Sequence, residues 1–279
     1  MAASRPVVLL TGAAGFVGRQ ILHALLERGC RVRVVVRDTK KDQIAQTPAI
    51  EISASADLFA ESPAWWADVC RDVDTVIHAA WYVEPGRYLQ SSKNRDCFSG
   101  TLRLAEGAQR AGVRRMVGIG TCFEYDLNVG YLSVDTPLKP STPYAQAKVD
   151  TFAALSRLLP ESGMEFAWCR LFYLFGEGED ARRLMPLLHA KLGAGEPVEL
   201  SSGATIRDYL DVRDAGRMIA EVALGSIQGP VNICSGKPIT VREIAEKIAD
   251  EYGRRDLLRF GARPDNLDPP CIVGVLTHG

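Results

Sequence analysis

Thr121, Tyr144 and Lys148 are the residues of this chain best suited to acid–base chemistry. Tyr144 and Lys148 are four positions apart, so on a helix they lie on one face, one turn apart. An ammonium near a phenol stabilises the phenolate and lowers the phenol pKa from about 10 toward neutral pH. Such a tyrosine can act as a general acid or base toward a carbinol or ketone, and Thr121 would hold the same oxygen. Such a pair alone more often marks a solvated helix face, but here Thr121 ends an apolar strand pattern at 116–120.

A glycine-rich turn lies near the start of the chain. Residues 7–10 are a short apolar run typical of a buried parallel strand, and residues 16–26 repeat apolar side chains with a helical period. Gly12, Gly15 and Gly18 lie between and at the start of these elements. Glycines let a backbone approach a pyrophosphate, and a helix N-terminus offers free N–H groups. This strand–turn–helix context favours a dinucleotide site over a purely structural turn. The contacts expected from this loop are Gly12, Gly15, Phe16 and Val17.

Strand and helix patterns alternate along the first 170 residues. The expected strands are 7–10, 31–36, 50–53, 75–79, 116–120 and 165–170, and the expected helices are 16–26, 88–112, 144–159 and 241–252. This rhythm predicts an α/β fold, a doubly wound, parallel Rossmann-type sheet with ligands at the carboxyl ends of its strands. We therefore expect an NAD(P)-binding domain at 1–170 and a smaller substrate-binding lobe at 171–279, with 205–233 returning to the main sheet.

The glycine spacing, taken with Thr121, Tyr144 and Lys148, resembles the extended short-chain dehydrogenase/reductase family of nucleotide-sugar epimerases, dehydratases and reductases. The matching segments are Asp57-Leu58, His78-Ala79-Ala80, Gly100-Thr101, Tyr144-Ala-Gln-Ala-Lys148, Arg170-Leu-Phe-Tyr-Leu-Phe-Gly176 and Arg207-Asp208-Tyr209. The resemblance implies an NAD(P)-dependent enzyme in which Thr121, Tyr144 and Lys148 are catalytic and Lys148 also binds the nicotinamide ribose. The further cofactor contacts that it implies are Asp57, Leu58, Ala79 and Ala80. Asp57 could equally cap a helix over 58–66.

The end of the second strand bears on the choice of cofactor. Folds that prefer NAD place an acid there for the ribose 2′-OH, whereas folds that prefer NADP place an arginine nearby. Here Val36 takes the acidic position, and Arg37 and Asp38 follow it. Arg37 could face a 2′-phosphate, stack on adenine or be an ordinary solvated charge, and Asp38 keeps NAD open. The sequence favours NADP over NAD.

The positions after Thr121 separate the reactions of the family. Its dehydratases carry an Asp-Glu pair directly after the catalytic threonine, where this chain has Cys122 and Phe123. Glu124 comes one position late and is expected to point the other way on an extended segment. These departures disfavour a 4,6-dehydratase. The favoured reaction is reduction of an NDP-4-keto-6-deoxy-hexose at C4 with Tyr144 as general acid. NAD-dependent 4-epimerisation and an inactive NAD(P)-sensing binding protein remain open.

Three residues are expected to contact the substrate in addition to Thr121. Arg207 matches the family arginine that binds the substrate diphosphate, which suits a planar guanidinium; the alternative is an ion pair with Asp208 or Asp211. Tyr173 stands where UDP-sugar epimerases of the family have asparagine. Trp81 could form a wall of the sugar pocket or be buried in the core.

Composition sets further limits. The chain has 279 residues and a net charge of −1, which offers no general attraction for nucleic acid or anionic membranes. No apolar run approaches the roughly 20 residues of a membrane span, and no signal-peptide pattern is present. The seven cysteines lack metal-ligand spacing, so we expect reduced thiols in a cytoplasmic protein without a bound metal. The expected partners are a nucleoside-diphosphate sugar and a second copy in a homodimer. The closing helix of the family is missing from the end of this sequence, which suggests truncation or local disorder there.

Overall fold

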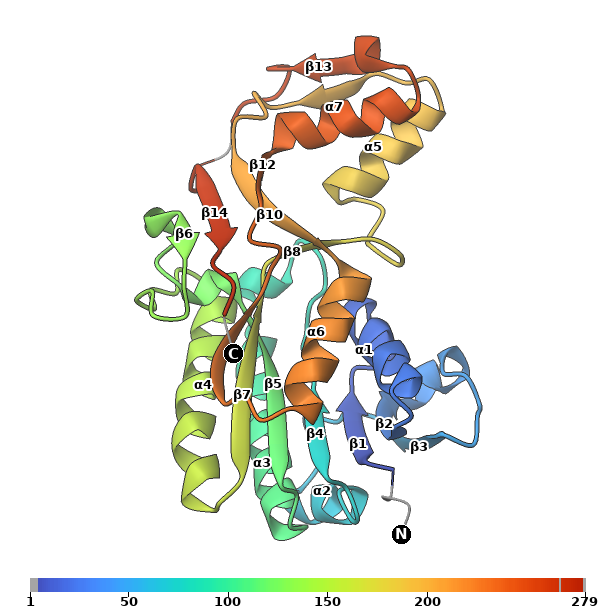
Figure 1. The fold of residues 1–279 in the computed structure, drawn as a ribbon, viewed down its shortest axis with the longest axis vertical. Coiled ribbons are helices and arrows are strands. Elements are labelled where there is room, and N and C mark those ends of the chain that lie inside the picture. Colours follow the sequence, from blue (N-terminus) through green and yellow to red (C-terminus); the bar gives the residue numbers. More distant parts are fainter. Residues whose placement is uncertain (1–4, 266, 278–279) are drawn as a thin grey trace.

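The computed structural model describes residues 5–265 and 267–277. Its main sheet has seven parallel strands in the order β11-β7-β5-β4-β1-β2-β3 (Figure 1). These strands are β1 (Val7–Thr11), β2 (Arg31–Arg37), β3 (Ile50–Ser55), β4 (Thr75–His78), β5 (Arg115–Thr121), β7 (Glu165–Leu171) and β11 (Gly229–Ile233). The order reverses direction between β1 and β4, which is the point where ligands bind in doubly wound sheets. The predicted fold class is confirmed.

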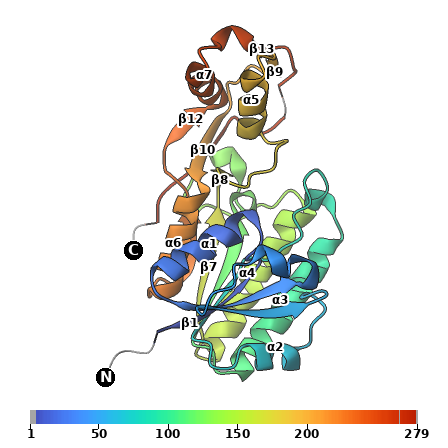
Figure 2. The same cartoon turned by 90° about the vertical axis from the view of Figure 1, so that its right-hand side faces the viewer.

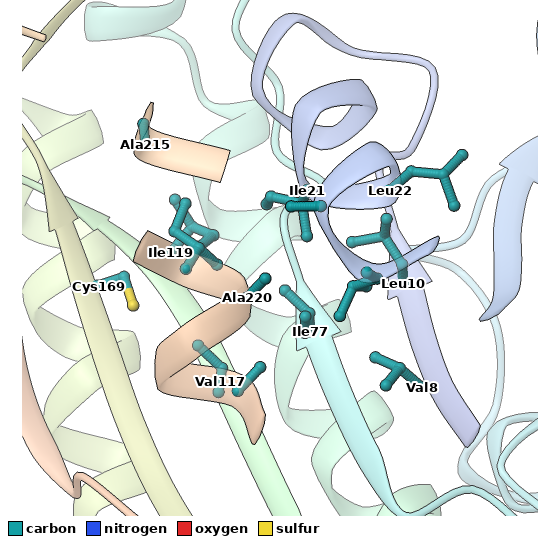
Figure 3. Close-up of a cluster of buried hydrophobic side chains, with 14 of the residues drawn as sticks. Val8, Leu10, Ile21, Leu22, Ile77, Val117, Ile119, Cys169, Ala215 and Ala220 are labelled. Atoms are coloured by element: carbon teal, nitrogen blue, oxygen red, sulfur yellow. The ribbon is translucent and has the colours of Figure 1, made fainter. Parts of the chain in front are cut away.

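Helices cover both faces of this sheet. On one face lie α1 (Phe16–Glu27) and α6 (Val212–Leu224), and on the other α2 (Pro63–Val69), α3 (Lys93–Arg110) and α4 (Pro143–Glu161). Alternate residues of a strand enter different cores: Val8 and Leu10 pack toward α1, whereas Leu9 packs toward α3. Figure 3 shows the first of these cores, in which Ile77 and Val117 from neighbouring strands meet Ile21 of α1 and Ala220 of α6.

A smaller second lobe lies beyond the carboxyl ends of the main strands (Figures 1 and 2). Its sheet has the order β12-β10-β14-β6, and β8 also pairs with β10. The strands are β6 (Tyr131–Leu132), β8 (Tyr173–Phe175), β10 (Ile206–Asp211), β12 (Pro238–Thr240) and β14 (Cys271–Gly274). A separate pair, β9 (Val198–Leu200) and β13 (Leu258–Phe260), packs with α5 (Leu184–Gly193) and α7 (Val241–Glu251).

Several segments differ from the expectations. Of the segment 205–233, α6 and β11 return to the main sheet, but β10 lies in the second sheet because it pairs with β8, β12 and β14. The expected helix 88–112 is a short 3₁₀ turn, η2 (Tyr88–Gln90), followed by α3. Asp57 does not cap α2, because that helix starts at Pro63 and Ser62 is its N-cap. Toward the end of the chain the described residues form β14, paired with β6 and β10; the expectation for the last two residues, 278–279, lies outside them.

Within the described part of the chain, no helix combines the length and apolar character needed to cross a membrane. The same residues contain no cluster of histidine, cysteine and acidic side chains able to hold a metal ion. The seven cysteines are free thiols, and all but Cys271 are buried.

Candidate active site

The glycine loop between β1 and α1 has the shape of a dinucleotide cradle. Gly12 has a φ of +76°, and a Cβ there would lie 2.8 Å from the backbone nitrogen of Ala80. A Cβ on Gly18 would overlap the carbonyl of Gly12. Gly15 is the exposed N-cap of α1, which has neither a side-chain cap nor an acidic residue in its first turn. The start of the helix thus presents uncapped N–H groups and no negative charge, which fits the pyrophosphate of NAD(P).

A buried histidine links this loop to the end of β4. The Oγ1 of Thr11 lies 2.8 Å from His78 Nδ1, and His78 Nε2 lies 3.0 Å from Thr101 Oγ1 on α3. Thr101 donates to the carbonyl of Cys97, so it accepts from Nε2, and His78 accepts from Thr11 at Nδ1. Burial, followed by the charge of Lys148, lowers the His78 pKa to about 3. His78 is therefore a neutral structural residue.

Thr121 and Tyr144 come together from two elements. Thr121 ends β5 and is the N-cap of the 3₁₀ turn η3 (Cys122–Glu124). Tyr144 lies in the first turn of α4, where Thr142 caps the helix through a 3.2 Å bond from the Ala145 N–H. The Tyr144 phenol is buried, and the Thr121 side chain lies close enough to lower its pKa against the larger, raising effect of burial. The fold thus brings the end of β5 and the first turn of α4 together at these two side chains.

The lysine of the set does not lie against the phenol oxygen. Lys148 donates from Nζ to the carbonyl of Ile119 at 2.7 Å, and its ammonium lies 3.6 Å from the centroid of the Trp81 ring. Its distance to the Tyr144 ring centroid is 5.9 Å. Burial lowers the Lys148 pKa to about 7, against an opposing effect of the Glu124 charge. Burial also raises the pKa of Tyr144, the opposite of the direction expected from the sequence, so the phenol is protonated at neutral pH.

Aromatic rings enclose this centre. Trp81 is half-buried, makes an edge contact with the Tyr144 ring at 6.5 Å, and donates from Nε1 to Asn94 Oδ1 at 2.8 Å. Tyr88 packs edge-on against Tyr144 at a centroid distance of 4.9 Å. Sequence patterns do not single out Tyr88, because they predict one regular helix over 88–112. The signal that could have located it is the Pro85-Gly86 pair just before it, which is typical of a turn.

Glu124 departs most clearly from the sequence prediction. The segment after Thr121 is not extended: η3 turns the Glu124 carboxylate back under β5, where it is fully buried. It accepts hydrogen bonds from the backbone N–H of Thr121 at 2.8 Å, from Trp168 Nε1 at 3.0 Å and from Arg170 Nε at 2.7 Å. The expectation of an extended segment was wrong, because Thr121 and Glu124 form a capping box, which is a helical motif.

The arginine expected to bind the diphosphate is buried at the start of β10. Arg207 donates from Nη1 to the carbonyls of Ile206 and Pro269, both at 2.9 Å, and lies 3.9 Å from Asp268. Neither ion pair considered from the sequence forms. The reason is that Asp208 accepts the N–H groups of Ser235, Gly236 and Gly274, and Asp211 pairs with Arg213.

Tyr173 lies beside Arg207. The guanidinium carbon is 5.5 Å from the Tyr173 ring centroid, and the same ring makes an edge contact with Phe123 at 6.3 Å. Phe123 directly precedes Glu124 in η3, so the second lobe and the end of β5 meet through these aromatic side chains. The structure thus brings Tyr173 and Arg207 together and connects them to the segment that carries Thr121.

The residues expected at the adenine end are placed as follows. Arg37 is exposed at the end of β2, and within the described residues its side chain has no hydrogen bond or ion pair. Asp38 pairs instead with Lys41 at 3.0 Å. Asp57 is exposed after β3 and accepts the N–H of Phe59 at 3.0 Å, and Leu58 is buried. Ala79 and Ala80 follow β4, beside the glycine loop.

The chain is similar in sequence to known enzymes and in fold to solved structures. Over 270 residues the chain is 24% identical to a dTDP-6-deoxy-L-talose 4-dehydrogenase (NAD(+)) from Aggregatibacter actinomycetemcomitans, covering 92% of this chain and 94% of that protein. It is 27% identical to a dTDP-6-deoxy-L-talose 4-dehydrogenase (NAD(P)(+)) from Kitasatospora kifunensis, and the match covers 94% of this chain and 84% of that protein. A solved UDP-N-acetylglucosamine 4-epimerase from Methanobrevibacter ruminantium superposes with a TM-score of 0.82 at 20% identity, covering 98% and 89%, and so shares the fold.

The family assignment rests on a sequence match over most of the chain. Residues 8–234 match the sequence profile described as the NAD dependent epimerase/dehydratase family. The matched segment contains the glycine cradle, the end of β5 and the start of α4, where Thr121 and Tyr144 meet. The chain therefore belongs to the NAD dependent epimerase/dehydratase family, within the extended short-chain dehydrogenases/reductases, and is an NAD(P)-dependent enzyme.

Proposed function

We propose that this protein reduces the C4 ketone of an NDP-4-keto-6-deoxy-hexose, with NADP favoured over NAD. The observation that carries the proposal is the buried, protonated Tyr144 phenol, which lies beside Thr121 at the carboxyl ends of the strands. A neutral phenol is the form needed to donate a proton to a carbonyl oxygen. Both residues lie on the side of the sheet where the glycine cradle receives a dinucleotide.

The side chains divide the work as follows. NAD(P)H held by the glycine cradle and Lys148 would supply a hydride for C4 of the sugar. Tyr144 donates its proton to the ketone oxygen, which becomes the carbinol, and Thr121 holds that oxygen in line. The Lys148 ammonium stabilises the negative charge that develops on the phenol oxygen and binds the nicotinamide ribose. Arg207 binds the diphosphate, and the Tyr173 and Trp81 rings enclose the sugar.

Two observations favour reduction at one carbon over dehydration. Removal of water across a neighbouring C–C bond requires a second acid and base beside Thr121, and the adjacent residues are Cys122 and Phe123. Burial raises the Cys122 pKa, so the thiol is neutral. Glu124, the next carboxylate, is bound by three donors beneath the strand. A dehydrogenase of a 6-deoxy-talose catalyses the reverse of such a reduction, and two relatives carry that name.

Arg37 supports the preference for NADP. A 2′-phosphate adds about 1.5 to 2 negative charges, and an exposed guanidinium without another partner in the described part of the chain is free to bind it at the end of β2. The neighbouring Asp38 is already paired with Lys41.

The test is an assay of hydride transfer with a panel of NDP-4-keto-6-deoxy sugars and either NADPH or NADH. We expect stoichiometric consumption of reduced nicotinamide, faster with NADPH, and a 4-hydroxy product by mass spectrometry. Interconversion of two 4-epimers with no net change in nicotinamide would establish the epimerase instead. Cofactor binding without turnover of any sugar would establish a binding protein. The Tyr144→Phe variant controls for contaminating reductases, because it should bind NADPH and lack turnover.

A further inference from the structure

The Glu124 carboxylate is a buried charge that the proposed reaction leaves unused. It is fully buried. Its two oxygens accept hydrogen bonds from the Thr121 backbone N–H, the Trp168 Nε1–H and the Arg170 Nε–H. An acceptor bound in this way is an ionised carboxylate. A buried ion pair contributes little net stability, because desolvation of both charges offsets their attraction. Stability alone therefore does not account for this pair.

The strand above it is shaped to admit this group. A Cβ on Gly120 would overlap both Trp168 Nε1 and Glu124 Oε1, and a Cβ on Gly118 would overlap the Trp168 ring. The two glycines lie on β5 directly before Thr121, on one face of the strand. The carboxylate and the indole can therefore lie directly against the backbone that carries Thr121 and Ile119, the residue whose carbonyl binds Lys148.

Lys148 lies close to the same group of side chains. Its ammonium is 5.7 Å from the Trp168 ring centroid, and the Nε1 of that ring binds Glu124. The other titratable groups that act on it or face it are neutral at pH 7. Burial raises the Cys97 pKa on α3 to about 11 and lowers the His78 pKa on β4 to about 3, and Tyr144 keeps its proton. Of these groups, only Glu124 is negatively charged.

The remaining charge in contact with the carboxylate is Arg170 on β7. Its Nη1 donates to the Tyr125 hydroxyl at 3.0 Å, which in turn donates to Asn232 Oδ1 at 2.7 Å. The guanidinium carbon lies 4.6 Å from the Tyr125 ring centroid and 4.9 Å from that of Phe152. The charge of Glu124 raises the Lys148 pKa against the lowering by burial.

We propose that Glu124 is a positioning residue of the reaction centre, which holds the end of β5 that carries Thr121 and provides the counter-charge of Lys148. This inference rests on the proposed function only for the roles of Thr121 and Lys148. It adds a group that does not touch substrate, cofactor or reacting atoms and acts through both of these residues.

The test uses the double variant Glu124→Gln/Arg170→Met, which removes both charges and leaves no buried charge unpaired. The matched control is Tyr125→Phe, which removes a hydroxyl from the same network and leaves the Glu124 contacts intact. The Lys148 ammonium is titrated by NMR in protein labelled at lysine Cε, with its signal assigned by its loss in Lys148→Met. We expect the midpoint to move to lower pH in the double variant, because Glu124 is the nearer of the two charges to the Trp168 ring beside Lys148, and to stay unchanged in Tyr125→Phe.

Activity provides the second readout. In the double variant kcat should fall about 10- to 100-fold, as for a misplaced catalytic group, with the sugar KM little changed and the alkaline limb of the pH profile moved to lower pH. Glu124→Asp keeps the charge but shortens the side chain by one methylene, so kcat should fall while the Lys148 midpoint stays. An unchanged midpoint and kcat in the folded double variant would overturn the proposal. If the double variant does not fold, a kcat of Glu124→Asp equal to that of the wild type would overturn the proposal.

The two proposals fail separately. Failure to turn over any sugar in the panel would refute the proposed function. The NMR titration needs no substrate, so it would still test the role of Glu124 in that case. Conversely, if the enzyme reduces its sugar but the titration midpoint and kcat are the same in the double variant as in the wild type, only the positioning role of Glu124 is refuted.

Discussion

Replacing Lys148 by methionine should stabilise the fold at neutral pH while abolishing turnover. Burial lowers the Lys148 pKa from its ordinary value of 10.5 to about 7. Each pKa unit corresponds to about 1.4 kcal/mol, so the buried ammonium costs the folded state about 4 to 5 kcal/mol at most. Methionine is of similar length and carries no charge, but it leaves the Ile119 carbonyl without its donor, which costs about 1 kcal/mol or more. We expect a net gain of about 2 kcal/mol in the free energy of unfolding.

The pH dependence of this gain identifies its cause. Below pH 7 Lys148 is protonated in both the folded and the unfolded chain, so the penalty is constant there. Between about pH 7 and 10.5 the unfolded chain binds the additional proton, so the wild-type stability rises with pH relative to the variant. The advantage of Lys148→Met should therefore be largest below pH 7 and disappear toward pH 10.5.

Urea unfolding of both proteins at several pH values, without added cofactor, measures this difference. Lys247→Met, an exposed lysine on α7, is the matched control for the substitution itself. A variant less stable than wild type at every pH, or a difference that does not change between pH 7 and 10, would refute the reasoning. The ammonium would then be well solvated or better compensated than its contacts with Ile119 and Trp81 indicate.

Three further substitutions test the site. Tyr144→Phe should lower kcat by about 10²- to 10⁴-fold, as expected for a lost general acid, and calorimetry should show NADPH binding retained; near-native turnover would rule out its role. Arg37→Ala should weaken NADPH binding by about 1 to 3 kcal/mol and barely alter NADH, whereas Lys41→Ala, whose ammonium pairs with Asp38, should leave both unchanged; equal losses for both cofactors would indicate adenine stacking. Gly12→Ala should weaken both cofactors and lower the melting temperature, because its φ of +76° and its approach to Ala80 exclude a side chain; unchanged binding would contradict the cradle.

The sequence determined most of the main sheet. Short apolar runs and helical periods predicted β1, β2, β5 and β7 to within one or two residues at each end, since these patterns depend on neighbouring residues. The prediction was less successful for 88–112, where local composition does not say that a turn at Tyr88 interrupts the helix before Lys93. The placement of β10 also needed the structure, because strand partners come from distant parts of the chain.

The candidate site divides in the same way. The glycine spacing is a local pattern, so the shape of the cradle could be predicted. The four-residue separation of Tyr144 and Lys148 placed both on α4. The direction of the Tyr144 pKa could not be predicted, because it depends on burial by the whole fold. Nor could the partner of Arg207, because the Pro269 carbonyl that it binds lies 62 residues away.

Glu124 shows what only the tertiary structure decided. The sequence fixes its distance from Thr121, and the capping box sets its local direction. Its role depends on Arg170 and Trp168, which are 46 and 44 residues away and meet it only because β7 lies beside β5. A charge buried among distant strands is defined by the partners that folding brings to it, and local patterns carry no information about those partners.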